Sequence, residues 1–330
     1  MKKNTNSGRR VISITHMSDI DGIGSAALLK MKYDIPDNRQ FFADYSVKSL
    51  EGVFGKLKRI YKKGDMLVIA DLGLNKGTIS IFSSIVKLFK NNGGRVAWFD
   101  HHPWSGEAIE KVASLCDIAI IGENRKHCAT EITHRELGFT DNFTKNFARV
   151  VHYSDFNIRP KKKEDYETVG TYALSIAYYN TLDEKKRDAN LHNIVNVLCS
   201  GKLTDRKMRS DAIRFDTTNK KRIKGMLSDL HVGKVAAVGF SKDIQSTSAC
   251  AAVMKKSRKD VALYINIDKG RGHIRSKITD CSSLAVGLGG GGHPHAAGFD
   301  VDMKKYGGFK TEASKEEFLK HVEALLSKKE

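Results

Sequence analysis

Three residues that could do chemistry together, Asp100, His101 and His102, directly follow the short apolar run 96–99. That run is long enough for one buried strand. A carboxylate and two imidazoles at the end of a buried strand are poor core material, because each must lose its hydration and then find a partner. Taken alone, the triplet would equally fit a capping aspartate beside two surface histidines. Whether similar residues gather at the same place decides between these two interpretations.

Acidic residues and histidines follow other apolar runs in the same way. They are His16, Asp19 and Asp21 around the end of the run 11–16, Asp71 at the end of the run 66–71, and Asp155 after the helical stretch 142–153. Each of them alone could be a loop carboxylate or a helix cap, and for Asp155 the cap is the simpler interpretation. Their common position after apolar elements favours a shared site.

The order of the predicted elements indicates how these residues would meet. Strands are expected at 11–16, 41–44, 66–71, 95–100 and 117–122, and helices at 22–33, 50–61 and 79–89. Strands that alternate with helices form a doubly wound, mainly parallel α/β sheet. Ligands of such a sheet bind outside the carboxyl ends of its strands. Three strands would therefore bring their acids and histidines to one edge, where we expect a metal site.

The types of side chain indicate which metal that site would hold. Carboxylates and imidazoles without thiolates suit manganese or magnesium better than structural zinc. Four carboxylates are too many for one ion, so two ions that share a carboxylate are expected. Metal pairs about 3.5–4 Å apart activate water and hold both oxygens of a phosphoryl displacement. The chemistry implied is hydrolysis of a phosphate ester or anhydride.

Composition and charge set the broader class of protein. The chain has 330 residues, of which 40% are hydrophobic, and its lysines and arginines exceed its acids by 56 − 38 = 18. This excess favours a polyanionic partner such as nucleic acid or a nucleotide, although solvated runs such as RPKKKEDYE at 159–167, expected to be a charged loop, carry much of it. No apolar run approaches the ~20 residues of a membrane helix. The five cysteines are scattered, as in a cytoplasmic protein with reduced thiols.

A second domain is expected after residue 230. We predict a first domain at 1–190, a helical linker at 191–230 and a smaller α/β domain at 231–330, which would face the first across a cleft. The landmark of the second domain is GLGGGGHPHAAGF at 287–299, which follows the basic segment GRGHIRS at 270–276. Consecutive glycines let a backbone approach a phosphate closely and turn its N–H groups toward it. A flexible turn is the alternative interpretation of the same glycines.

These segments together resemble the motifs of the DHH phosphoesterase superfamily. The matching segments are DIDG at 19–22, IAD at 69–71, DHH at 100–102 and the later Asp155, with GGGH at 290–293 resembling the loop of the DHH-associated C-terminal domain. The superfamily includes RecJ exonucleases, nanoRNases that also take 3′-phosphoadenosine 5′-phosphate, cyclic-dinucleotide phosphodiesterases and family II pyrophosphatases. The C-terminal domain argues against a pyrophosphatase.

The resemblance implies a role for each matched residue. Asp71 would bridge two manganese ions, with magnesium as the alternative metal; Asp19 would join one ion, and Asp21, His101 and Asp155 the other. His16 matches a histidine that precedes the first motif in many members and is included among the ligands. Asp100 would orient its neighbours, and His102 would contact the scissile phosphate or assist the leaving group. The residues implied to hold a substrate phosphate or a 3′-terminal nucleotide are Gly290, Gly291, Gly292 and His293, with Arg275 as a charged clamp.

The function expected from this resemblance is a manganese-dependent phosphodiesterase or exonuclease that degrades short single-stranded RNA or DNA to nucleoside 5′-monophosphates. One alternative is a hydrolase of cyclic dinucleotides or of 3′-phosphoadenosine 5′-phosphate. An alternative of another class is a non-catalytic, nucleic-acid-binding replication scaffold. The sequence leaves open RNA against DNA, the polarity of attack and the oligomeric state, a homodimer included.

Overall fold

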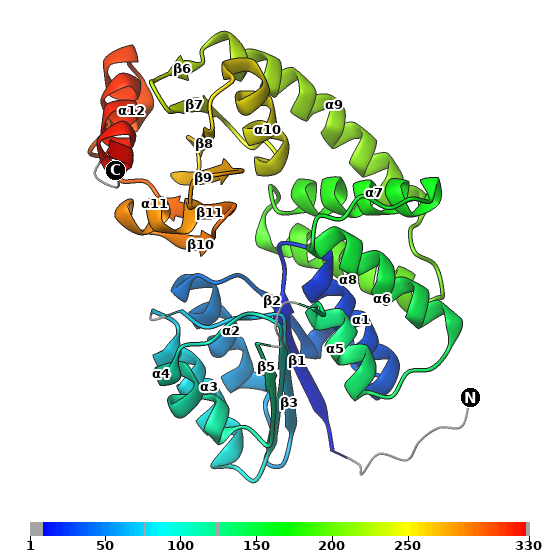
Figure 1. Ribbon diagram of the computed structural model, residues 1–330. Helices are drawn as coiled ribbons and strands as arrows, with labels where there is room; N and C mark the ends of the chain where they lie inside the picture. The colour runs from blue at the N-terminus through cyan, green and yellow to red at the C-terminus, as the bar shows by residue number, and fades with distance from the viewer. Residues whose placement is uncertain (1–8, 76, 123–125, 328–330) are drawn as a thin grey trace. The chain divides into compact units, whose positions relative to one another are not determined.

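The computed structural model describes residues 9–75, 77–122 and 126–327. The chain divides into two compact units, 1–213 and 214–330. The division falls inside one long helix, α9 (Arg206–Ser228). In Figure 1 the first unit runs from blue to green, and the second from yellow-green to red.

The first unit is built on a five-stranded sheet in which every neighbouring pair of strands is parallel. The strand order is β2-β1-β3-β4-β5, with β1 (Val11–His16), β2 (Gln40–Ala43), β3 (Met66–Ala70), β4 (Arg95–Asp100) and β5 (Ile118–Ile121). This confirms the predicted doubly wound, parallel sheet. All of β1 and nearly all of β3 and β4 are buried, as expected for strands covered on both faces.

Alternate residues of the central strands enter two separate cores. Val68, Ala70 and Phe99 pack into one core, and Ile69 and Trp98 pack into the other. One face is covered by α1 (Ile20–Tyr33), α5 (Ala129–Glu136), α6 (Asn142–Asp155), α7 (Lys163–Tyr179) and α8 (Glu184–Cys199), and the other by α2 (Val47–Ile60), α3 (Ile79–Lys90) and α4 (Gly106–Lys111). Two short 3-10 turns, at Asp37–Arg39 and Ala113–Leu115, complete the unit.

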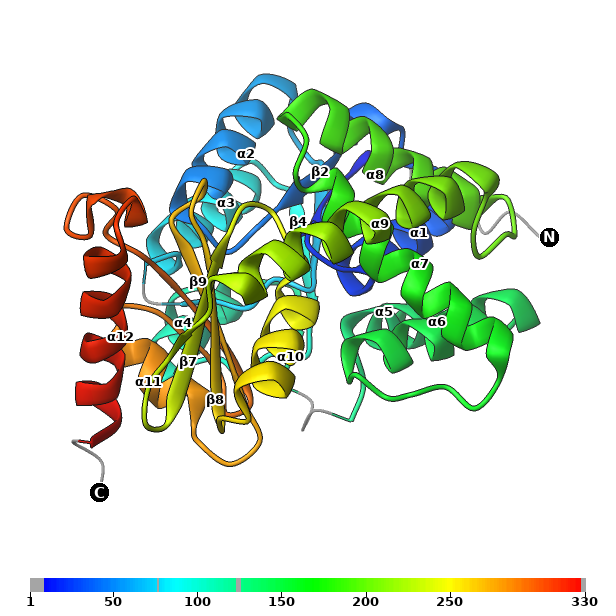
Figure 2. The same cartoon turned by 90° about the horizontal axis from the view of Figure 1, so that it is seen from above.

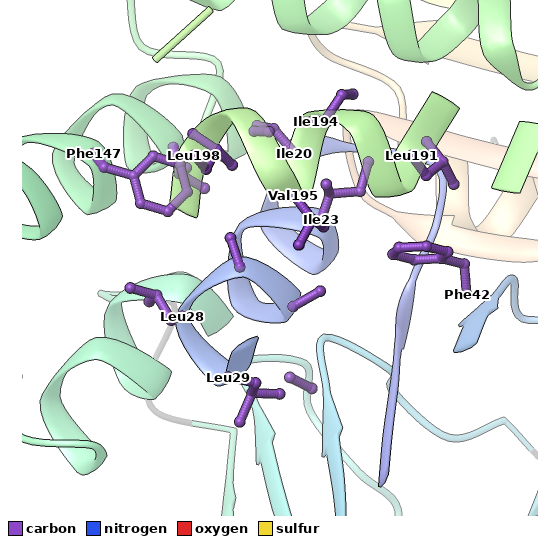
Figure 3. Close-up of a cluster of buried hydrophobic side chains, with 14 of the residues drawn as sticks. Ile20, Ile23, Leu28, Leu29, Phe42, Phe147, Leu191, Ile194, Val195 and Leu198 are labelled. Atoms are coloured by element: carbon purple, nitrogen blue, oxygen red, sulfur yellow. The ribbon is translucent and has the colours of Figure 1, made fainter. Parts of the chain in front are cut away.

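The covering helices are held by apolar side chains that meet between them. Figure 3 shows Ile20 and Ile23 of α1 near Ile194 and Val195 of α8, with Leu191 of α8 near Phe42 of β2. Helices α5 and α6 lie side by side in Figure 2. The tight packing of α1 matters for the site described below, because α1 begins directly at the carboxyl end of β1.

The second unit has a mixed, six-stranded sheet of order β10-β11-β9-β8-β7-β6, in which β7 and β8 pair in parallel and the other described pairs are antiparallel. Its strands are β6 (His231–Val232), β7 (Ala236–Ser241), β8 (Val261–Asn266), β9 (Arg271–Ser276), β10 (Gly291–His293) and β11 (Ala296–Asp300). Helix α10 (Ser246–Ser257) packs on one face, and α11 (Cys281–Gly287) and α12 (Glu312–Ser327) on the other, with α10 and α12 on opposite sides of the strands in Figure 2. A 3-10 turn, Gly307–Phe309, precedes α12.

Apart from small shifts at the ends of helices and strands, the structure differs from the sequence-based expectations at three places. The segment 159–167 is only partly a loop, because α7 already begins at Lys163. Asp155 is the last residue of α6 instead of following it. Residues 191–230, expected to be a helical linker, do lie largely in the helices α8 and α9, but α8 contributes apolar side chains to a core of the first unit. Among the described residues, no helix is both long enough and apolar enough to cross a membrane.

Candidate metal centre

The predicted ligands lie around the carboxyl ends of β1, β3 and β4. His16 is the last residue of β1, and Asp71 comes directly after β3. Asp71 has a positive φ of 57°, a conformation that costs energy for any residue except glycine but that aspartate tolerates better than most. Strain of this kind is found at functional sites, where the surrounding structure enforces it. Here it turns the carboxylate of a fully buried residue toward the edge of the sheet.

A first group of ligands consists of His16, Asp19 and Asp71, whose ligand atoms all lie within 4.8 Å of one another. His16 Nδ1 lies 3.2 Å from Asp19 Oδ2 and 3.4 Å from Asp71 Oδ2. The other oxygen of Asp19 caps α1, because it accepts hydrogen bonds from the backbone of Asp21 and Gly22. The cap holds Asp19 in place and leaves one of its oxygens facing His16.

A second group consists of Asp21, His101 and Asp155. His101 Nδ1 lies 3.7 Å from Asp155 Oδ2, and His101 Nε2 lies 3.8 Å from Asp21 Oδ2 and 3.5 Å from Asp71 Oδ1. Asp71 therefore directs one oxygen toward each group. A carboxylate with this placement is suited to bridge two cations.

Backbone groups hold Asp21 from the other side. Its two oxygens accept hydrogen bonds from the backbone N–H groups of Ala129 and Thr130 at the start of α5, at 2.8 and 2.7 Å. The oxygen atoms keep further lone pairs for a cation. Gly22 brings α1 this close to β1, because a Cβ atom at that position would lie 2.2 Å from the carbonyl oxygen of His16.

The electrostatics of the centre favour a positive partner. Asp21 and Asp71 are 0% and 1% exposed. Burial, followed by the nearby Asp21 and Asp19 carboxylates, raises the pKa of Asp71 well above its ordinary value. Burial and the Asp21 charge raise the pKa of Asp155 in the same way. Closely spaced buried carboxylates are stable in the charged form only beside cations.

Several buried polar atoms of the centre have no hydrogen-bond partner among the residues that the structure describes. They are His16 Nδ1, Asp71 Oδ2 and His101 Nε2. Such atoms normally find a partner in a native protein, and all three face the two ligand groups. The set of carboxylate oxygens and imidazole nitrogens therefore fits divalent ions such as manganese or magnesium.

The cysteines are not candidate metal ligands of this centre. Burial raises the pKa of Cys116 to about 12, of Cys199 to about 11 and of Cys250 to about 12. These thiols stay protonated at neutral pH and so are poor metal ligands. No cysteine belongs to a metal-ligand cluster in the described part of the chain.

Asp100 is directed away from the two ligand groups and fixes His102 instead. One oxygen of Asp100 lies 2.8 Å from His102 Nδ1, and the other accepts a hydrogen bond of 2.7 Å from Trp104 Nε1. Trp104 packs edge-on against Trp98, with ring centroids 4.7 Å apart. Gly73 leaves the space for His102, because a Cβ atom at position 73 would lie 2.8 Å from that of His102.

Two residues of the centre are absent from the sequence-based set. The ring of Tyr45 packs against His16 at a centroid distance of 4.5 Å and a tilt of 46°, and its hydroxyl lies 3.5 Å from His102 Nε2. It follows β2, so the rule that places ligands after parallel strands would have found it had aromatic residues been considered. Trp104 is the second, and its side chain reaches back four residues to Asp100. No local sequence pattern predicts the hydrogen bond from Trp104 to Asp100.

The predicted substrate-binding residues lie in the second unit, around the strand pair β10 and β11. Position 293 pairs with Ala296, which in turn pairs with Arg275 of β9, so the three positions form one row of the sheet. The side chain of His293 lies outside the described part of the chain. Arg275 is half-buried.

The glycines of this strand pair serve its own packing in part. A Cβ atom at Gly290 would lie 2.1 Å from the carbonyl oxygen of Gly298, and Gly292 has a φ of 148° and no room for a Cβ atom. Gly291 has open space at the same position. Two of the three predicted phosphate-binding glycines are therefore also required by the turn itself.

No protein-family model and no curated protein matches the sequence. Solved structures do match. RecJ from Thermus thermophilus in complex with Mn²⁺ has a TM-score of 0.60 and 15% identity, over 97% of this chain and 52% of the RecJ chain. The DHH domain of a member of a ribosomal-protein family has a TM-score of 0.58 and 13% identity, over 95% of this chain and 87% of its own. The chain has the DHH fold.

A third solved structure has the same fold at nearly the same length. A pGpG-specific phosphodiesterase from Vibrio cholerae has a TM-score of 0.54 and 13% identity, over 95% of this chain and 99% of its own. Within the DHH fold of the present chain, the predicted site residues form two sets. One set gathers at the edge of the parallel sheet (His16, Asp19, Asp21, Asp71, Asp100, His101, His102 and Asp155), and the other lies around β9 and β10 of the second unit (Arg275, Gly290, Gly291, Gly292 and His293).

Proposed function

We propose that this protein is a phosphodiesterase that uses two divalent ions, preferably manganese, to hydrolyse short oligonucleotides to nucleoside 5′-monophosphates. The observation that carries the proposal is the position of Asp71. Its Oδ2 faces His16 at 3.4 Å and its Oδ1 faces His101 at 3.5 Å. A bridging carboxylate between two ligand groups is the arrangement expected of a two-metal hydrolase.

The ligand groups divide the remaining residues between the two ions. His16 and Asp19 would hold one ion, and Asp21, His101 and Asp155 the other, with Asp71 shared. When bound, the ions supply an activated water and neutralise charge on the phosphoryl group. The protein contributes the fixed carboxylates, because capping and backbone hydrogen bonds hold Asp19 and Asp21 before any substrate arrives.

His102 would act on the phosphate itself. Burial lowers the pKa of His102, but the hydrogen bond and charge of Asp100 outweigh burial and raise the pKa above its ordinary value. A protonated His102 can donate from Nε2 to a phosphate oxygen or to the leaving oxygen. Asp100 orients the ring by bonding to Nδ1, and Trp104 holds Asp100.

The second unit would bind the end of the substrate. Arg275 supplies a cation that can pair with a phosphate, and position 293 shares its row of the sheet. This part of the proposal accounts for a preference for short substrates. In a short oligomer the terminal group and the bond to be cleaved are close together, so binding of the end also positions that bond for hydrolysis.

One alternative substrate has a specific observation in its favour. The Vibrio cholerae structure that shares the fold over almost the whole chain is named for the dinucleotide pGpG. A hydrolase of linear or cyclic dinucleotides, or of 3′-phosphoadenosine 5′-phosphate, would use the same metal centre. A non-catalytic scaffold would not need two complete ligand groups with buried, unpartnered atoms, so the geometry disfavours it.

A product analysis tests the proposal. The purified protein is incubated with end-labelled RNA and DNA ladders, with pGpG, with cyclic dinucleotides and with 3′-phosphoadenosine 5′-phosphate, each in manganese, magnesium, zinc or EDTA. We expect mononucleotides from the shortest oligomers, fastest in manganese and none in EDTA. Hydrolysis of cyclic dinucleotides or of 3′-phosphoadenosine 5′-phosphate alone would replace the proposed substrate class, and no hydrolysis of any substrate would refute the enzymatic proposal.

A further inference from the structure

A strongly basic segment follows Asp155 and has no role in the chemistry proposed above. It runs from 157 to 163, and with Tyr166 of α7 we call it the basic loop. It carries four cationic residues, namely Arg159, Lys161, Lys162 and Lys163. The sequence alone suggested only a solvated charge run at this place.

The basic loop is fixed to the metal centre at its first residue. Asn157 has a positive φ of 53°. Its N–H bonds to the carbonyl of Ser154, and the N–H of Ile158 bonds to the carbonyl of Tyr153. This is the Schellman arrangement that ends a helix in one defined direction. Because Asp155 is the last residue of that helix, the loop leaves the centre along a set path.

The far end of the basic loop is fixed as well. Pro160 is buried, and Asp165 in the first turn of α7 accepts a hydrogen bond of 2.8 Å from Arg149 of α6. The loop is therefore tied to the helices before and after it. Arg159 follows Asp155 by four residues, and an extended chain spans at most about 3.6 Å per residue, so their Cα atoms lie no more than about 14 Å apart.

The basic loop surrounds a depression of about 520 Å³. Its lining residues are Arg159, Pro160, Lys161, Lys162, Lys163 and Tyr166. The guanidinium of Arg159 lies over the ring of Tyr166, 5.5 Å from its centroid. Tyr166 is nevertheless 54% exposed. An exposed aromatic ring among cations is thus available for contact.

Most of the cations of the depression have no acidic partner among the residues that the structure describes. Across the described residues, Arg159, Lys161 and Lys162 form no ion pair, and Lys163 pairs only loosely with Glu167 at 3.7 Å. Four adjacent cations raise the local concentration of anions. An acidic protein partner would use the cations alone, whereas the exposed ring adds a stacking surface, which favours a nucleic-acid base.

We propose that the basic loop is a binding site for single-stranded nucleic acid, which holds the strand beyond the nucleotide that the metal centre cleaves. Lys161 and Lys162 contact backbone phosphates, and a base stacks on Tyr166. Proteins that bind single strands without sequence preference combine cations with stacking rings in this way. The site rests on the proposed function for its substrate class, and its placement after Asp155 gives a longer strand a second point of attachment.

Binding of a labelled, single-stranded hexanucleotide to the full-length protein tests the site, measured by fluorescence anisotropy in EDTA so that no hydrolysis occurs. Tyr166→Ala removes the ring, and Tyr166→Phe keeps it. A double variant, Lys161→Ala with Lys162→Ala, removes two cations. The matched control is Lys62→Ala with Lys63→Ala, because these two adjacent, exposed lysines precede β3, at the edge of the sheet opposite the metal centre.

We expect Tyr166→Ala to weaken binding about 5- to 100-fold, as is typical of a lost stacking contact, and Tyr166→Phe to bind as the wild type does. The double lysine variant should weaken binding and reduce the slope of log K against log salt by about 1.4, the value for two phosphate contacts on a single strand. The control pair should change neither the affinity nor the slope by a comparable amount.

Two results would overturn the site. Equal losses in the loop pair and in the control pair would mean that overall charge alone attracts the strand. Unchanged binding in Tyr166→Ala, with polyphosphate competing as well as the oligonucleotide, would mean that a simple anion is the ligand. Thermal unfolding of each variant excludes a folding defect as the cause of a loss. If the wild type hydrolyses no oligonucleotide but the loop variants still lose binding as predicted, the proposed function fails and the binding site stands.

Discussion

His16 Nδ1 lies 3.4 Å from Asp71 Oδ2, and within the part of the chain that the structure describes neither atom has a hydrogen-bond partner. Both residues are buried. A buried polar group left without a partner costs about 1–3 kcal/mol, so the pair gains stability when a third group joins it. A cation between the two atoms would satisfy both. This contact places His16 in the same group as the ligands that follow the other strands.

Replacing His16 tests whether it is a ligand. We expect His16→Ala to weaken the affinity of the first ligand group for manganese at least about 10- to 100-fold. That range is typical when a residue that only supports a metal ligand is lost. Isothermal titration with manganese measures the effect. His134→Ala is the control, because His134 bonds to Thr144 and takes no part in the centre. Equal manganese affinity in both variants would remove His16 from the ligand set.

The metal-free protein should become less stable as the pH rises from 7 to 8. The folded-state pKa values of Asp71 and Asp155 are raised, for Asp155 to about 9. The folded protein therefore holds protons that the unfolded chain has released, and stability falls as the pH rises. His16 and His102, whose pKa values are also raised, act in the same direction. Histidines with lowered pKa values, such as His273, oppose the trend only below about pH 6.5.

Thermal unfolding in EDTA at pH 7 and pH 8 measures this effect. Each retained proton contributes about 1.4 kcal/mol per pH unit, so the midpoint should fall by several degrees. Saturating manganese should abolish the decrease, and Asp71→Asn should reduce it. A midpoint in EDTA that is constant or rises from pH 7 to pH 8 would contradict the proposed crowding of buried carboxylates.

Much of the fold follows from the sequence because its signals are local. The strands β3 and β4 contain continuous apolar runs, as burial on both faces favours, and in β1 the only polar residues are Ser13, Thr15 and His16. The rule that ligands bind at the carboxyl ends of parallel strands then predicts the meeting of His16, Asp71 and His101. Bonds between distant segments have no such signal. The backbone of Thr130 holds Asp21 across 109 positions of the chain, and only the folded packing of α1 on α5 brings them together.

Other features were missed because tertiary contacts override local patterns. The start of α7 lies within a charged run that resembles a solvated loop, but Asp165 is held there by Arg149, sixteen residues away. The short strand β10 is formed by glycines that favour no regular structure in isolation. Its pairing with β11 supplies the order. The run of glycines in the sequence marks this segment as a candidate binding loop, but it does not predict that the segment forms a strand.

Trp104 is a positioning residue whose effect can be separated from packing. Trp104→Phe removes the hydrogen bond to Asp100 but keeps an aromatic ring beside Trp98. Hydrogen bonds to charged groups contribute about 1.5–3 kcal/mol, so kcat should fall about 10-fold or more while KM changes little. The pH profile of kcat should also shift, because Asp100 sets the protonation of His102.

Trp98→Phe is the matched control for this experiment. It also loses an indole hydrogen bond, in this case of 3.1 Å to the backbone of Leu72. We expect Trp98→Phe to lower thermal stability without moving the pH profile. If Trp104→Phe lowers only stability, with kcat and its pH profile unchanged, Trp104 supports the fold and has no positioning role.

The rate at which Asp71→Asn hydrolyses a dinucleotide in saturating manganese tests the two-metal account most directly. Asparagine keeps the shape of aspartate and tolerates the positive φ at this position, so the fold should survive, as thermal unfolding can confirm. The substitution removes the shared charge between His16 and His101. We predict that the rate falls by several powers of ten, because both the nucleophile and the charge stabilisation depend on the ions. A variant that keeps more than about a tenth of the wild-type rate would contradict the account.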